Sequence, residues 1–120
     1  MACVCAQGPP PAHRKLSRFL CLVECTAADG SALTASVSGG CAGYEETARM
    51  VVEAALALAF EPHLCPGTAT GGVLPPAVAL GENLVRRLHA VGIRFDVHPE
   101  GGVPRARSFF ADAAKLGAKL

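Results

Sequence analysis

The segment from residue 71 to residue 97 constrains the fold of this chain more than any other. Its first part, residues 71–76, is rich in glycine and proline and predicts a turn. Residues 82–91 place apolar side chains at helical spacing, and Gly92 follows where a left-handed helix cap is expected. Residues 93–98 alternate apolar and polar side chains, which indicates a strand with one exposed face. The segment therefore predicts a turn, a helix, a glycine stop and a strand.

A β-hairpin is predicted upstream, over residues 18–38. Residues 19–25 form a compact apolar run, and Cys21 and Cys25 within it are expected to be small buried hydrophobic residues. Asp29-Gly30 favours a hairpin turn, since both residue types tolerate positive φ. The returning strand alternates, with Leu33, Ala35 and Val37 on an apolar face and Thr34, Ser36 and Ser38 on an exposed polar face.

A helix is predicted from Tyr44 to Phe60, ended by Pro62. Glu45 and Glu46 fall in its first turn, where carboxylates favour the positive end of the helix dipole. The helix is apolar around most of its circumference, which predicts that it is covered on most sides; the residues are Ala48, Val51, Val52, Ala55, Leu56, Leu58 and Ala59.

Different structures are predicted for the two ends of the chain. Residues 1–17 contain Gly8 and three consecutive prolines and predict a disordered, proline-rich leader. Residues 99–120 form a C-terminal extension that is expected to be helical from Ser108 to about Lys119. This last segment is basic and amphipathic, so packing against the domain and contact with a membrane surface are both open.

Composition limits the chain to one domain with a thin core. At 120 residues it can bury roughly two-thirds of its unfolded surface. Apolar residues make up 51% of the sequence, but aromatic residues only 5%, and much of the apolar fraction is alanine, which buries little area. Such a core is expected to be marginal alone and better supported by a partner or a further domain.

Charge and cysteine usage narrow the functional class. The net charge of +1 gives no basic footprint for a nucleic acid. Six cysteines are present, but no secretory signal is visible, so an intracellular, reducing location is favoured over a disulfide scaffold. The longest apolar run, residues 50–60, is too short to span a bilayer.

Motifs for chemistry are weak, and the sequence assigns no catalytic, cofactor-binding or metal-binding residue. Gly67 and Gly72 have the spacing of a P-loop, but Val73 stands where the phosphate-binding lysine belongs. The residues Cys41, His63 and Cys65 match no zinc spacing. The histidines, including His89 and His98, are expected to be structural or exposed, and Tyr44 is expected to make a core or capping contact.

The order of elements resembles the C-terminal part of the saccharopine dehydrogenase-like oxidoreductases, a family that includes the trans-acting enoyl reductases of glycolipid synthesis. The likeness covers about residues 18–98. Its most characteristic positions are Gly43, Tyr44, Glu45, Gly71, Gly72, Pro76 and Gly92. Pro75 departs from the pattern, because a small hydroxyl residue is expected there.

The resemblance implies an α/β or α+β fold: a small sheet with an antiparallel hairpin and two or three packed helices. It also implies NAD or NADP as the cofactor of the full-length family, bound by a separate dinucleotide-binding domain. This sequence contains no G-x-G-x-x-G. The leading interpretation is a truncated or fragmentary relative that is inactive alone, and the alternative is a non-enzymatic binding or subunit-association module. Expected partners are a full-length homologue or a second copy, and the resemblance also allows contact with a membrane or lipid droplet.

Overall fold

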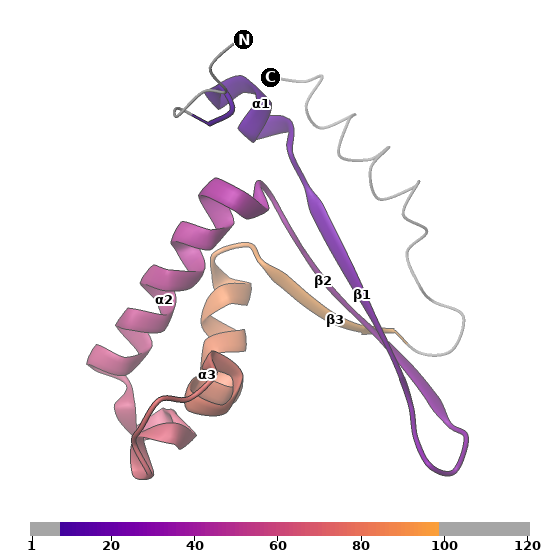
Figure 1. The fold of residues 1–120 in the computed structure, drawn as a ribbon, viewed down its shortest axis with the longest axis vertical. Coiled ribbons are helices and arrows are strands. Elements are labelled where there is room, and N and C mark those ends of the chain that lie inside the picture. Colours follow the sequence, from indigo (N-terminus) through magenta and orange to yellow (C-terminus); the bar gives the residue numbers. More distant parts are fainter. Residues whose placement is uncertain (1–7, 99–120) are drawn as a thin grey trace, which may run out of the picture.

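The computed structural model describes residues 8–98 and shows an α+β fold (Figure 1). In chain order its main elements are α1 (Pro11–Leu16), β1 (Phe19–Thr26), β2 (Ala32–Gly39), α2 (Thr47–Phe60), α3 (Pro76–Ala90) and β3 (Arg94–His98). The predicted small sheet with an antiparallel hairpin and packed helices is confirmed. The helix expected within residues 99–120 lies outside the described residues.

The proline-rich leader is not wholly irregular, because α1 occupies residues predicted to be disordered. Pro11 is the first residue of this helix, where its missing N–H removes no hydrogen bond and its fixed φ is already helical. Ser17 ends the helix in an extended conformation, and its hydroxyl donates to the carbonyl of His13 at 2.9 Å. The three prolines thus start a helix here.

The predicted hairpin is confirmed, with β1 and β2 joined by a tight turn. The Ala27 N–H donates to the Ser31 carbonyl at 2.8 Å, and the Gly30 N–H donates to the Ala27 carbonyl at 3.0 Å. Only Gly30 takes a positive φ, of 84°, which is the three-residue loop with a left-handed glycine. The Ser31 hydroxyl and N–H both donate to Asp29, and they hold the pKa of that carboxyl below its usual value.

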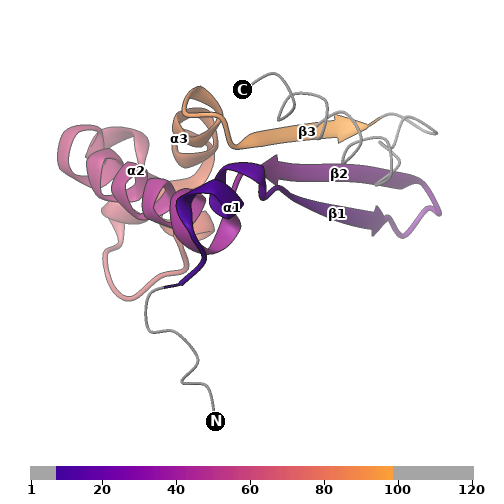
Figure 2. The ribbon, with the colours of Figure 1, turned by 90° about the horizontal axis from the view of Figure 1, so that it is seen from above.

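The sheet is antiparallel with the order β1-β2-β3, so β2 lies in the middle (Figure 2). Register places Cys21, Val37 and Phe95 side by side, and likewise Val23, Ala35 and Val97. Since side chains alternate along a strand, these odd-numbered residues share one face of the sheet.

Burial of the two sheet faces differs from the prediction. Cys21 and Cys25 are exposed, whereas Ser36 and Ser38 are buried. The two serines are short residues of the central strand, and longer side chains flank them on both neighbouring strands: Leu22 and Asp96 beside Ser36, and Leu20 and Arg94 beside Ser38. The expected polar face is therefore covered locally, while the apolar face is largely open.

A five-residue π-helical turn, η1 (Ala42–Glu46), leads into α2, so the predicted helix begins and ends where expected. The prediction that α2 is covered on most sides is wrong. Only Ala57 is buried, and the Val51 side chain is 64% exposed. The physical reason is visible in Figure 1, where α3 lies along one side of α2 and the sheet diverges from it.

Helix α3 starts earlier than predicted and contains a break. Gly81 has φ 55° and ψ −141°, so the turn of residues 76–80 is offset from the rest of the helix. A side chain could not be placed at Gly81 without crowding Pro66, whose Cγ lies 3.0 Å from the ideal Cβ position. Gly92 has φ 100° and caps the helix as expected, with its N–H donating to the His89 carbonyl at 3.2 Å.

The hydrophobic core is small and lies between α2, α3 and the loop that joins them. Ala57, Cys65 and Leu80 form its centre, and Ala54, Ala79 and Leu84 pack against it. Ile93, which lies between α3 and β3, is fully buried. This agrees with the marginal core that the alanine-rich composition predicts.

Candidate functional site

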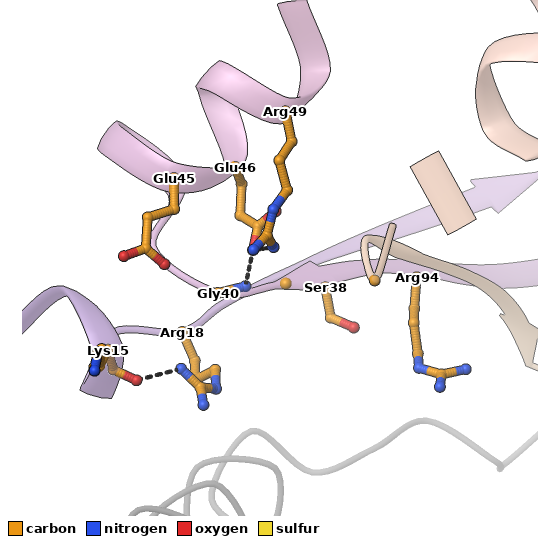
Figure 3. Close-up of a pocket in the computed structure, with 10 residues that line it drawn as sticks. Lys15, Arg18, Ser38, Gly40, Glu45, Glu46, Arg49 and Arg94 are labelled. Atoms are coloured by element: carbon orange, nitrogen blue, oxygen red, sulfur yellow. Dashed lines mark hydrogen bonds and ion pairs between the residues drawn. The ribbon is translucent and has the colours of Figure 1, made fainter. Parts of the chain in front are cut away.

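A basic hollow lies where α1, the β2–α2 turn and the start of β3 meet (Figure 3). Its volume is about 520 Å³. Its lining combines four cationic side chains, two carboxylates and small residues: Lys15, Arg18, Arg49, Arg94, Glu45, Glu46, Ser38, Gly39, Gly40 and Gly92. Elements from both halves of the chain build it, so it exists only in the folded protein.

Two glycines form the tight wall of the hollow. A Cβ at Gly39 would lie 2.7 Å from the Phe19 ring, and a Cβ at Gly40 would lie 2.7 Å from Glu46 Oε1. The Gly40 N–H donates to that same oxygen at 3.0 Å. A side chain at either position would have to displace Phe19 or Glu46, so glycine lets the backbone approach both residues closely.

Glu46 is the most enclosed charged group of the hollow, with only 2% of the residue exposed. Arg49 pairs with its Oε1 at 2.9 Å. Its second oxygen, Oε2, is buried and has no hydrogen-bond partner among the described residues. The prediction placed Glu46 at the helix dipole, whereas the structure has it bridging Gly40 and Arg49.

The cations of the hollow give it its electrostatic character. Figure 3 shows Arg18, Ser38 and Arg94 pointing to the same side of the sheet. Arg18 donates to the carbonyls of Lys15 and Ser17 at 2.8 and 2.7 Å. Within residues 8–98, no carboxylate lies at ion-pair distance from Arg18 or Arg94. These groups can hold an anion, but the hollow contains no nucleophile hydrogen-bonded to a base.

The residues singled out by the family resemblance do not lie together in the structure. Glu45 and Gly92 both line the basic hollow. Gly71 and Gly72 lie on the loop before α3, both with positive φ, and line a different, smaller hollow. Pro76 is the first residue of α3, and Gly43 lies within η1 with open space around it. The structure thus joins only part of the set.

Tyr44 makes a local surface contact and not the expected core or capping contact, since 48% of the residue is exposed. The Arg14 guanidinium lies over its ring, 5.9 Å from the ring centre. A Cβ at Gly8 would clash with the Tyr44 hydroxyl. This tyrosine therefore packs between α1 and the leader.

The thiols and imidazoles form no reactive centre in the part of the chain that the structure describes. Cys65 is buried, and its thiol donates to the Glu61 carbonyl at 3.4 Å. Cys41 is buried elsewhere, at the start of η1. No group of three potential metal ligands gathers within residues 8–98. Sequence reasoning missed one polar pair, Ser36 Oγ and His98 Nε2 at 2.7 Å, because only strand register brings these residues together.

An ion-pair network that the sequence did not reveal ties α2 to α3. Arg87 pairs with Glu53 at 2.7 Å and with Glu61 at 3.2 Å, and Arg86 pairs with Glu61 at 3.0 Å. Desolvation alone would lower the pKa of Arg87, but hydrogen bonds to the two carboxylates outweigh it, so the pKa rises. The pKa of Glu61 is lowered, chiefly by a hydrogen bond from Asn83 and then by Arg87.

A second candidate surface is the apolar sheet face. It consists of Cys21, Val23, Cys25, Leu33, Ala35, Val37, Phe95 and Val97, all on one side of the sheet by register. Toward the hairpin turn it is open: Val23 is 43%, Leu33 49% and Val97 66% exposed. Contiguous apolar surface of this kind marks an interaction site more often than a solvated one.

No protein-family model, curated protein or solved structure matches the chain. Within the described residues, none of the helices combines the length and apolar character needed to cross a bilayer.

Proposed function

We propose that this chain is a non-catalytic association module that packs its apolar sheet face against a partner chain. The observation that carries the proposal is the open half of that face. Val23 and Val97 flank Ala35 across the three strands, and Leu33 stands beside Cys25, yet α2 and α3 leave these positions exposed.

The energetics favour a covered state. Burying a Val or Leu side chain contributes roughly 1.5–3 kcal/mol. The core of the described chain is small, centred on Ala57, Cys65 and Leu80. Val23, Leu33 and Val97 are already partly buried, so covering them completely would add roughly half of that amount each, a few kcal/mol in all. That sum is still a substantial part of the net stability of a small domain. The proposed partner is a second copy or a larger homologous chain, in an intracellular setting.

The test is a charge placed on the exposed patch at Val97, on the edge strand β3. Val97→Asp should lower the binding of an apolar fluorescent dye and reduce association seen by sedimentation, while circular dichroism stays unchanged. Val73→Asp is the matched control, since Val73 is fully exposed on a loop. A wild-type chain that binds no dye and stays a folded monomer at every concentration would contradict the proposal.

A second candidate function follows from the resemblance and from the basic hollow. In this proposal the chain supplies the substrate-side surface of a saccharopine dehydrogenase-like oxidoreductase, and another domain or chain binds NAD or NADP. The hollow favours it, because Glu45 and Gly92 lie there beside Arg18 and Arg94, which suit an anionic substrate.

Titration of the purified chain with NADPH, followed by nucleotide fluorescence, tests the placement of the cofactor. The second candidate expects no saturation with the isolated chain. Saturable binding at micromolar NADPH would contradict the assignment of the cofactor to another domain or chain.

A further inference from the structure

Strand β1 has an open edge. It pairs with β2 on one side, and no described strand pairs with it on the other (Figure 2). Backbone groups along an antiparallel strand point alternately toward and away from the neighbouring strand. Since Ala27 bonds to Ser31, the odd-numbered residues Cys21 and Val23 also direct their backbone groups to β2. The N–H and C=O groups of Leu20, Leu22, Glu24 and Thr26 consequently point outward along the edge.

This edge lacks the devices that usually protect one. Natural edge strands are short, or carry lysine, proline or a bulge. Strand β1 spans eight residues, contains neither lysine nor proline, and has Glu24 as its single charge. The residues from Cys21 to Thr26 are all exposed, so the strand is accessible from outside.

We propose that β1 pairs antiparallel with β1 of a second copy, centred on Leu22, to form a continuous sheet across a twofold axis. The inference rests on the proposed function only in taking a second copy as the partner; it adds a second contact, the β1 edge, beside the apolar sheet face. In this arrangement Leu22 faces the second copy's Leu22, and Leu20 faces the second copy's Glu24. Each such pair exchanges two backbone hydrogen bonds.

Charge complementarity and the length of the paired stretch together select this register. Glu24 lies diagonal to the second copy's Arg18, about 7–8 Å apart, within reach of a long side chain. Figure 3 shows that Arg18 points to the same side as Ser38, which is the even-numbered side that Glu24 shares. The pairing creates two symmetric ion pairs.

The neighbouring registers are less favourable. Centring on Val23 brings the two Glu24 side chains diagonal to each other. Centring on Cys21 sets Glu24 directly opposite the second copy's Arg18, but it shortens the stretch of β1 that is paired. Sliding one strand by a single residue from any of these registers would set an odd-numbered residue opposite an even-numbered one. Odd-numbered residues of β1 direct their backbone groups to β2, so they could not bond to the second copy.

The pairing also extends the apolar sheet face. Cys21 faces the second copy's Val23, and Phe19 faces the second copy's Cys25. The apolar faces of two copies therefore become one continuous surface with its axis at Leu22. A closed twofold contact of this kind limits the assembly to a dimer.

The first experiment is Leu22→Lys, followed by sedimentation velocity over a wide concentration range. Lysine at this position keeps the bonds to β2 and blocks the edge. We expect wild type to populate a dimer, and the variant to raise the dimer dissociation constant by about tenfold or more. Val73→Lys is the matched control and should dimerise as wild type does. An unchanged dimer in Leu22→Lys would overturn the proposal.

A charge exchange tests the register. Glu24→Arg alone should weaken the dimer, because the new cation lies diagonal to the second copy's Arg18. The double variant Arg18→Glu with Glu24→Arg should restore it. Failure of the double variant to recover dimerisation, with both variants folded by circular dichroism, would contradict the Leu22-centred register.

Cysteine cross-linking gives an independent readout. Serine replaces Cys3, Cys5 and Cys25, and Val23→Cys is introduced. Mild oxidation should link Cys21 to position 23 of the second copy, since directly opposed pairs that do not share hydrogen bonds have close Cβ atoms. Adding Cys21→Ser should abolish the link. A link that persists without Cys21 would show the Val23-centred register instead.

Different results would overturn edge pairing and the association module. A dimer that Val97→Asp disrupts and Leu22→Lys does not would overturn edge pairing and leave the association module in place. Absence of any association, together with absence of dye binding, would overturn both.

Discussion

The helical half and the sheet half of this protein differ in how fully they bury their apolar side chains. Helices α2 and α3 pack on each other around Ala57 and Leu80, and ion pairs of Arg87 hold them together. The sheet, by contrast, leaves its apolar face open toward the hairpin turn, and no described strand pairs with the outer edges of β1 and β3. The helical half is thus stabilised internally, whereas the sheet half has the exposed apolar surface on which the proposed association depends.

The largest expected effect separates two residues of the same segment. Ile93→Ala removes a fully buried side chain and should cost about 2–5 kcal/mol of unfolding free energy, enough to unfold a small domain. Val97→Ala removes a side chain that is 66% exposed and should change stability by only about 0.5 kcal/mol. Urea denaturation measures both. Equal losses would contradict the difference between the buried site at Ile93 and the open sheet face at Val97.

A backbone effect of intermediate size is expected inside the helical half. Gly81→Ala forces a side chain onto a φ of 55° and against Pro66, which should cost about 1–3 kcal/mol. Gly43→Ala is the matched control, because Gly43 has no positive φ and nothing near its Cβ position. Thermal unfolding followed by circular dichroism compares them. A tolerated alanine at Gly81 would show that the break in α3 is not fixed by this glycine.

The smallest effect concerns the ion pairs of the helical half. Glu61 has a pKa below its unfolded value of 4.5, so its charge stabilises the fold above that value. This contribution is lost as pH falls through the lower folded pKa. Glu61→Gln should therefore destabilise the chain near neutral pH and lose its effect in acid. A Glu61→Gln penalty that stays constant from neutral to strongly acidic pH would contradict the role of the carboxylate.

The sequence predicts the elements well, because the signals for them are local. Asp29-Gly30 locates the hairpin, Pro62 ends α2 and Gly92 caps α3. Local signals also explain why α1 is not predicted: the run of prolines indicates an irregular leader, although Pro11 is compatible with a first helical position.

Burial and the candidate site were harder to predict, because they depend on how the elements meet. The apolar pattern of α2 does not reveal that only α3 covers it. The approach of Gly40 to Glu46 and the pairing of Ser36 with His98 join residues through the fold and not through a motif. The resemblance to an oxidoreductase family stays a prediction.

Amide hydrogen exchange along β1, measured residue by residue at increasing protein concentration, tests the incomplete sheet most directly. The amides of Cys21 and Val23 bond to β2 and should be protected at every concentration. The amides of Leu20, Leu22 and Glu24 should exchange rapidly in dilute protein and become protected as the dimer forms. Rapid exchange of those outward amides at the highest concentration reached would contradict the account.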